Sequence, residues 1–266
     1  FRDNQVQHPI FNIDDTVGRE FSKEFKSNAL TTGIDRNADF KAENITFTKF
    51  GCAFTLKTPF GAGEIHSRLL GRHNVYNLLS AIAAAMVQDI PLGKIQQALL
   101  NIQPIPGRFE CIDNNQGISV LVDYAHTDDA LANAISAAKD FTEGKLIVVF
   151  GCGGDRDKGK RKTMGQVVLS GADFTVITSD NPRSEDPEQI IGDILLGVPA
   201  SAREGEDYVA IINRQKAIEH AIHLAEKNDL VLIAGKGHED YQILKTGAIH
   251  FDDREVARSA LRKRGQ

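Results

Sequence analysis

The stretch Phe174-Thr-Val-Ile-Thr-Ser-Asp-Asn-Pro-Arg183 begins as an apolar, β-branched run and ends in four polar residues. Such runs are typical of buried parallel strands, and open sheets bind ligands beyond the carboxyl ends of those strands. At that place Asp180 can accept from an ammonium, and the planar guanidinium of Arg183 fits a carboxylate. Pro182 fixes its own φ and ends the strand. The segment therefore favours a clamp for an amino-acid head group, although Asn181-Pro182 alone also signals an ordinary turn.

The rest of the C-terminal portion repeats this strand pattern. Three more apolar runs, at 119–122, 146–150 and 230–234, read as strands, like 174–178. Stretches with helical periodicity lie between the strands, at 129–141, 164–169, 187–196 and 211–225. Strands that alternate with helices predict a parallel sheet with right-handed crossovers. The fold class that we expect is therefore α/β, with a Rossmann-like, doubly wound C-terminal domain.

Polar motifs follow each of the four predicted strands. They are Asp123-Tyr-Ala-His126, Gly151-Cys-Gly-Gly-Asp155, Asp180-Asn-Pro-Arg183 and Gly235-Lys-Gly-His-Glu239. Carboxyl ends of parallel strands lie at one edge of a sheet, so we expect the four motifs to converge on one crevice. There Glu239 can pair with an ammonium while Arg183 pairs with a carboxylate. His126 is open to interpretation as a proton donor, a nucleotide contact or a hydrogen-bonded structural residue.

The first hundred residues predict part of another α/β unit. Residues 45–56 and 64–70 read as a β-hairpin around a turn at 59–63, and a helix is expected over 74–86, with Asn74 as its cap. A second short helix follows Pro91. The segment Gln103-Pro-Ile-Pro-Gly107 breaks the pattern, so we place domains at 1–104 and 105–266, with Arg108 at the junction.

Residues Gly154 to Arg161 have the phosphate-loop spacing G-x-x-x-x-G-K, but Arg161 stands where Ser or Thr would hold Mg²⁺. With Arg156, Lys158 and Lys160 beside it, this segment favours a flexible basic loop that binds a carboxylate or phosphate. A nucleotide phosphate loop is the weaker interpretation, because the spacing alone is a weak signal.

The composition of the chain excludes several classes of protein. The chain has 266 residues, 41% of them hydrophobic, and a net charge of -5, which argues against general nucleic-acid binding. Three widely spaced cysteines, Cys52, Cys111 and Cys152, indicate reduced thiols in a cytoplasmic protein. No apolar run approaches 18 residues and no signal peptide is visible, so we expect no membrane span. The start at Phe1 without Met favours a piece of a longer polypeptide, and a processed N-terminus is the alternative.

Taken together, these motifs resemble the Mur ligase family over nearly the whole chain. The resemblance rests on Asn12-Ile-Asp-Asp15, His73 to Asn77, Pro106 to Glu110, Asp123 to His126, Gly151 to Arg161, Asp180 to Arg183, Gly235 to Gln242 and Phe251-Asp-Asp-Arg254. Asp128 departs from the family, which usually has Pro there. The family's N-terminal substrate domain, G-T-x-G-K-T phosphate loop, metal-binding Glu and His residues and carbamylated Lys have no counterpart here. The resemblance therefore implies the last part of a central ATPase domain followed by a complete C-terminal domain.

The resemblance also implies an activity. In this family a glutamyl carboxylate is phosphorylated by ATP with Mg²⁺, and an amine then attacks the acyl phosphate. For this chain it implies addition of meso-diaminopimelate to UDP-MurNAc-L-Ala-D-Glu in peptidoglycan synthesis. Arg183 favours diaminopimelate, because relatives that add lysine typically lack this Arg. The implied ATP contacts are Asn74, Asn77, Arg108, Asp123 and His126. The implied diaminopimelate contacts are Arg156, Asp180, Asn181, Arg183, Gly235 and Glu239.

Two alternatives stay open beside this ligase. One is a folylpolyglutamate synthase-like ligase of the same superfamily, and the other is an amino-acid- or nucleotide-binding module without activity. We expect a monomer that acts on small molecules, and we expect this chain alone to be inactive, with its catalytic and metal-binding residues elsewhere. We also expect the part after Arg108 to fold independently, and the part before Pro104 to be less stable.

Overall fold

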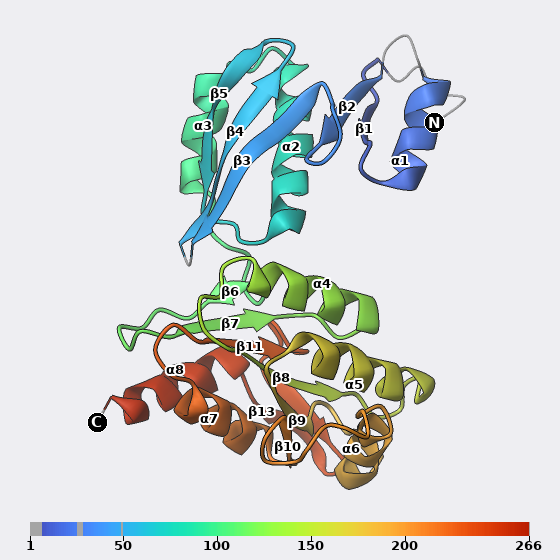
Figure 1. Ribbon diagram of the computed structural model, residues 1–266, viewed down its shortest axis with the longest axis vertical. Coiled ribbons are helices and arrows are strands. Elements are labelled where there is room, and N and C mark those ends of the chain that lie inside the picture. The colour runs from blue at the N-terminus through green and yellow to red at the C-terminus, as the bar shows by residue number, and fades with distance from the viewer. Residues whose placement is uncertain (1–6, 26–28, 49, 266) are drawn as a thin grey trace. The chain divides into compact units, whose positions relative to one another are not determined.

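The computed structural model describes residues 7–25, 29–48 and 50–265 (Figure 1). The first residue, on which the expectation of a longer polypeptide rests, lies outside these ranges. The chain divides into two compact units, Phe1–Gln103 and Pro104–Gln266. Among the described residues, no helix combines the length and the apolar character that crossing a bilayer requires.

The N-terminal unit is a five-stranded sheet in the order β1-β2-β3-β4-β5. The first three strands run parallel and the last three antiparallel. Apolar residues of α2 and α3, such as Val75, Leu79 and Ile95, pack with Phe40 and Phe54 of the sheet to form the core. The elements are β1 (Ile10–Asn12), α1 (Thr16–Glu24), β2 (Leu30–Gly33), β3 (Phe40–Thr48), β4 (Gly51–Thr58), β5 (Gly61–Ser67), α2 (Arg72–Met86) and α3 (Leu92–Asn101).

Two predictions for this unit were wrong. Residues 45–56 are not one strand, because the chain passes within them from β3 to its antiparallel neighbour β4. The predicted cap Asn74 lies inside α2, where its Nδ2 donates to the Leu70 carbonyl at 2.7 Å. The helix instead begins after Gly71, which has a positive φ of 86° and gives no side-chain cap.

The C-terminal unit contains a six-stranded sheet in the order β10-β9-β8-β11-β7-β6. All neighbouring pairs are parallel except β6 with β7. The four central strands β7, β8, β9 and β11 are almost wholly buried and rich in Val, Ile and Leu, as expected for a parallel sheet covered on both faces. The α/β, doubly wound prediction is confirmed. The strands are β6 (Glu110–Cys111), β7 (Ser119–Asp123), β8 (Leu146–Cys152), β9 (Phe174–Ser179), β10 (Tyr208–Ile211) and β11 (Leu230–Ala234).

Helices cover both faces of this sheet (Figure 1). On one face α7 and α8 pack against Val120, Val149 and Val231. On the other lie α4, α5 and α6, which pack side by side. The helix after β8 and the last helix after β11 therefore lie on opposite faces, so the ends of these neighbouring strands form a topological switch point. The remaining elements are α4 (Asp128–Lys139), α5 (Gly159–Gly171), α6 (Pro187–Leu195), α7 (Arg214–Leu224), the hairpin β12 (Tyr241–Leu244) and β13 (Gly247–His250), and α8 (Asp253–Arg264).

Two element boundaries differ from the prediction in ways that affect the site. Ile211 was predicted to start a helix, but it is the last residue of β10, and α7 begins at Arg214. The helix predicted over 164–169 begins earlier, at Gly159, and therefore includes Arg161. Arg161 thus belongs to a regular helix and not to a loop.

Candidate functional site

The four strand-end motifs meet at one cavity of about 320 Å³ in the C-terminal unit. It opens where β7, β8, β9 and β11 end, which is the switch point of the sheet. The convergence expected from the parallel strands is therefore present in the structure. Its lining includes Tyr124, His126, Gly151, Cys152, Gly153, Arg156, Lys160, Arg161, Asp180, Asn181, Arg183, Gly235 and Glu239.

Asn181 joins the segment after β9 to the segment after β11. Its Oδ1 accepts from the Lys236 ammonium at 3.0 Å and from the Ile243 N–H at 2.9 Å, while its Nδ2 donates to Glu239 Oε2 at 3.1 Å. The side chain is buried, with 4% of its surface exposed. These contacts occupy the Asn181 amide, so its contribution to the cavity is to fix the two loops against each other.

Arg183 is the half-buried cation of the cavity. Its backbone is left-handed, with φ of 53°, and its N–H donates to the Ile243 carbonyl at 3.0 Å. One guanidinium nitrogen, Nη1, donates to the Gly154 carbonyl at 2.7 Å. Among the described residues Nε and Nη2 have no hydrogen-bond partner, so this edge of the fork remains available to a carboxylate.

Two carboxylates lie in the same cavity. Glu239 accepts through Oε2 from Asn181 and Lys236, both at 3.1 Å, while its Oε1 has no partner among the described residues. Asp180 accepts the Asn181 N–H at 2.6 Å. Gly235 has a φ of 120°, and a Cβ there would lie 2.8 Å from Asp180 Oδ2, so glycine is needed to leave room for this carboxylate. The arrangement can receive an ammonium.

The basic segment after β8 is held by an ion-pair network and is not the flexible loop that was predicted. Arg161 has 1% of its side chain exposed and donates to both oxygens of Glu185, at 3.0 and 2.8 Å. Glu185 also accepts the Asp155 N–H at 2.6 Å and pairs with Lys158 at 3.2 Å. The network therefore fixes both ends of the turn that carries the exposed Arg156 into the cavity.

The contribution of Glu185 to the stability of the fold should depend on pH in the acid range. The hydrogen bonds from Arg161 lower the pKa of Glu185 from 4.5 to about 2. A lowered folded-state pKa contributes stability that is complete above the unfolded value and is lost as the pH falls toward the folded value. We therefore expect the difference in unfolding free energy between the wild-type chain and Glu185→Gln to be constant above pH 5. The difference should shrink between about pH 4.5 and 2.

Urea unfolding followed by circular dichroism at several pH values measures this difference. Glu206→Gln, at an exposed ion pair with Arg203, is the control. A difference that shrinks already near pH 6, or one that persists unchanged at pH 2, would contradict the role given to Arg161.

Cys152 lies in the cavity wall but is not suited to act as a nucleophile. Burial, together with the nearby Asp180 carboxylate, raises the pKa of its thiol to about 12. Its sulfur lies 3.6 Å from the sulfur of Met164. A thiol held in its neutral form is a packing residue, because the thiolate is the reactive species.

The residues proposed to contact nucleotide lie in both units. In the C-terminal unit the exposed Arg108 stands over the Tyr124 ring at 4.8 Å, and the His126 ring packs edge-on against the same ring at 4.6 Å. Asp123 is buried and accepts the N–H groups of Phe109 at 2.9 Å and Ala125 at 2.8 Å, so it holds the turn next to Arg108. In the N-terminal unit Asn77 Nδ2 donates to Asn74 Oδ1 at 3.1 Å on α2.

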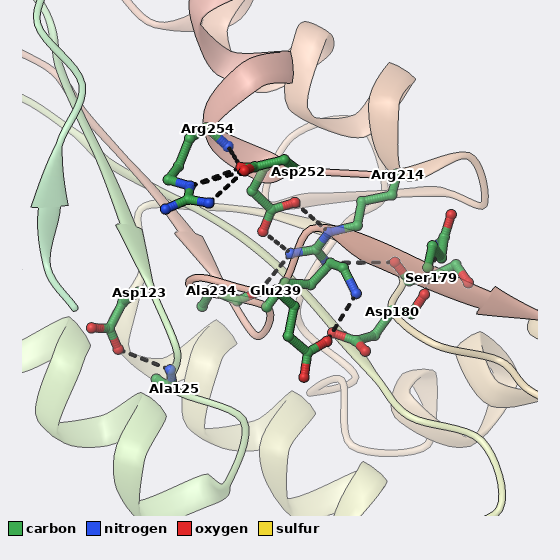
Figure 2. Close-up of polar contacts among 12 residues, drawn as sticks. Asp123, Ala125, Ser179, Asp180, Arg214, Ala234, Glu239, Asp252 and Arg254 are labelled. Carbon is green, nitrogen blue, oxygen red and sulfur yellow. Dashed lines mark hydrogen bonds and ion pairs between the residues drawn. The ribbon is translucent and has the colours of Figure 1, made fainter. Parts of the chain in front are cut away.

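Sequence reasoning missed the residue that supports the cavity from below, Arg214. The side chain is fully buried and forms a two-point pair with Asp253, with Nε to Oδ1 at 2.8 Å and Nη2 to Oδ2 at 2.7 Å. Nη2 also donates to the Ala234 carbonyl at 2.9 Å. Figure 2 shows this guanidinium with the Asp180 and Glu239 side chains on the same side of it. Its helical spacing with Ala217 and Ile218 was a signal that it faces the core.

The described residues offer no metal centre of their own. Among residues 7–25, 29–48 and 50–265, no three or more His, Cys, Asp or Glu side chains are grouped so that they could hold a metal ion.

Comparisons with known proteins identify the family of the chain. The description "Mur ligase, glutamate ligase domain" matches residues 107–237, and "Mur ligase middle domain" matches residues 2–85. The chain is 46% identical over 264 residues to a Geobacillus thermodenitrificans protein named UDP-N-acetylmuramoyl-L-alanyl-D-glutamate--2,6-diaminopimelate ligase, covering 99% of this chain and 53% of that protein. A protein of the same name from Thermosynechococcus vestitus is 46% identical over 261 residues, covering 96% and 51%. The chain thus spans about half the length of the curated relatives it matches.

Solved structures give the same result. A structure of a ligase with that name superposes with a TM-score of 0.73 at 36% identity, covering 98% of this chain and 54% of the other. A folylpolyglutamate synthase from Mycobacterium tuberculosis superposes with a TM-score of 0.62 over 92% of this chain and 52% of its own, but at 17% identity it shows a shared fold alone. With two domain descriptions matched in order and several relatives above 40% identity, the chain belongs to the Mur ligase family.

Proposed function

We propose that this chain is the part of an ATP-dependent amide ligase that binds the incoming amino acid, and that this amino acid is meso-diaminopimelate. The observation that carries the proposal is the pairing of an unused guanidinium edge on Arg183 with an unused oxygen on Glu239 in one cavity. These two groups match the carboxylate and the ammonium of an amino-acid head group. The name shared by the relatives above 40% identity supports the same substrate.

Diaminopimelate carries two amino-acid head groups, and the cavity suits one of them. In this proposal Arg183 and Arg156 hold the carboxylate of the distal head group, while Glu239 and Asp180 hold its ammonium. Gly235 leaves the space between them, and Asn181 fixes the loops. The second head group then projects from the cavity, so its amine is free to attack. Binding at a distance in this way orients the amine before the reaction begins.

The proposed reaction activates a carboxylate, because a carboxylate is a poor electrophile. ATP transfers its γ-phosphoryl group to the glutamyl carboxylate of UDP-MurNAc-L-Ala-D-Glu. The amine of diaminopimelate then attacks the acyl phosphate, phosphate leaves, and the amine loses a proton. We propose Asn74, Asn77, Arg108, Asp123 and His126 as contacts to ATP. Since ATP is a cytoplasmic substrate, we propose that the reaction takes place in the cytoplasm. We further propose that the ligase acts as a monomer.

An amide-ligation assay with ATP, UDP-MurNAc-L-Ala-D-Glu and the parent enzyme tests the function. The parent enzyme is the full-length ligase of which we propose this chain to be a part. We expect phosphate release that depends on meso-diaminopimelate, with lysine used far less well because it has no distal carboxylate for Arg183. Equal use of lysine would refute the substrate assignment. If calorimetry shows that diaminopimelate binds, but the parent enzyme forms no amide under any condition, the alternative of a binding module without activity would be favoured.

A further inference from the structure

Lys236 is a lysine with no exposed side-chain surface, placed directly beneath the proposed ammonium site. Its Nζ donates to Asn181 Oδ1 at 3.0 Å and to Glu239 Oε2 at 3.1 Å, and it stands 5.5 Å from the centre of the Tyr241 ring. Lysine is almost never fully buried unless it is paired. The pairing partners here are two residues of the candidate site, so its role concerns that site.

The contacts of Lys236 make the two oxygens of Glu239 unequal. Oε2 receives hydrogen bonds from both Lys236 and Asn181, whereas Oε1 has no partner among the described residues of the chain. A glutamate side chain in solution samples many rotamers, and fixing one of them before a ligand arrives removes that entropy cost from binding. Lys236 therefore presents one oxygen of Glu239 in a fixed direction.

The positive charge of Lys236 also affects the Glu239 carboxylate. The Lys236 ammonium pairs with Glu239 at 3.1 Å, and the buried Arg214 lies near the carboxylates of Asp180 and Glu239. Both cations therefore offset part of the carboxylate charge at the place where an ammonium would bind. Removing Lys236 would leave Glu239 without its buried partner.

We propose that Lys236 is a positioning residue that makes this site select an amino acid whose distal end carries an ammonium. It acts through Glu239 and does not touch the substrate. The inference rests on the proposed function, and it deepens it by assigning recognition of the distal ammonium to a buried pair. Recognition of the distal carboxylate belongs to Arg183, which lines the same cavity.

Two substrates separate recognition of the distal ammonium from recognition of the distal carboxylate. Meso-diaminopimelate has both distal groups, whereas L-2-aminopimelate keeps the attacking amine and the distal carboxylate but lacks the distal ammonium. The measured quantity is the ratio of kcat/KM for diaminopimelate to kcat/KM for 2-aminopimelate in the parent enzyme. We expect Lys236→Met to lower this ratio about tenfold, which corresponds to one hydrogen bond to a charged group. A merely structural role would lower both values together and leave the ratio unchanged.

A double-mutant cycle with Glu239→Gln tests whether the effect passes through Glu239. Glu239→Gln alone should lower the ratio, and Lys236→Met added to it should lower the ratio no further. Lys245→Met, which removes an exposed cation nine residues along the same segment, is the matched control and should leave the ratio unchanged. Independent losses in the cycle would overturn the proposed route.

A measurement on the wild-type enzyme covers the case in which Lys236→Met fails to fold. With lysine labelled at Nζ with ¹⁵N, the buried ammonium should give a slowly exchanging resonance. That resonance should shift when diaminopimelate binds and shift little with 2-aminopimelate. Equal shifts would overturn the inference. If wild-type enzyme shows no preference for diaminopimelate over 2-aminopimelate and lysine, the proposed function itself fails. If the preference exists but survives Lys236→Met, only the inference fails.

Discussion

Replacing Arg214 by Met should lower the free energy of unfolding of the C-terminal unit by about 3–5 kcal/mol. Removing one partner of a buried pair leaves the other charge without compensation, and Asp253 is 0% exposed. Burial by itself lowers the pKa of Arg214, but the neighbouring carboxylates, Asp253 first, more than offset this and raise it overall, so the guanidinium is charged. Met has a similar reach but cannot donate to Asp253 or to the Ala234 carbonyl.

Native-state hydrogen exchange of the β11 amides measures this loss, because a central strand exchanges through global opening of its unit. Lys216→Met, an exposed cation on the same helix, is the control and should change the free energy by less than about 0.5 kcal/mol. The double variant with Arg214→Met and Asp253→Leu should recover much of the loss, since apolar replacement of a whole buried pair is often neutral or stabilising. Equal losses for Arg214→Met and Lys216→Met would show that the pair has no structural role.

Arg214 also holds in place two strand ends that lead into the binding cavity. Ala234 and Ser179 are the last residues of β11 and β9, and their carbonyls accept from the same guanidinium, at 2.9 and 3.4 Å. The next residues along the chain are Gly235 and Asp180, which line the cavity. Arg214 therefore fixes two strand ends at the spacing that the site requires. A site built from loops depends on such a fixed floor, because loops are the more mobile parts of a fold.

The sequence was sufficient to locate the four central strands of the C-terminal sheet, because a sheet covered on both faces requires continuous apolar runs. It missed the two edge strands, β6 and β10. It placed 230–234 as a strand, and β11 has these bounds. It also brought four motifs together, since parallel strands share one edge. It did not predict that β11 inserts between β7 and β8, because strand order depends on packing between helices that are distant in sequence.

Arg161 was misinterpreted and Arg214 was missed because their charged partners lie far away in the chain. Arg161 was interpreted as part of a flexible basic loop that binds a carboxylate or phosphate, but it is buried against Glu185 and Asp193, at separations of 24 and 32 residues. No local pattern reveals such a pair. Ile211 was assigned to a helix because its apolar side chain fits the helical period of the following segment. The parallel pairing of β10 with β9 overrides that local preference.

Replacing Arg183 by Ala should weaken binding of meso-diaminopimelate by roughly tenfold to a hundredfold while leaving nucleotide binding nearly unchanged. A hydrogen bond to a charged group contributes about 1.5–3 kcal/mol, which sets this range. The substitution adds no new backbone strain, because Arg183 already has a Cβ in its left-handed conformation. It also removes the bond to the Gly154 carbonyl, so the neighbouring loop loses one contact.

The matched ligand is lysine, which lacks the distal carboxylate. Its affinity should change little on Arg183→Ala, or rise, because the unpaired cation that faces its distal ammonium is gone. Arg183→Lys separates charge from shape: Lys keeps the charge but lacks the planar fork, so affinity for diaminopimelate should lie between that of wild type and that of Arg183→Ala. Titrations of both amino acids and of a non-hydrolysable ATP analogue against the three proteins measure these effects. If diaminopimelate and lysine lost affinity equally, Arg183 would be holding the loop at Gly154 and not the substrate, and the choice of diaminopimelate would lose its structural support.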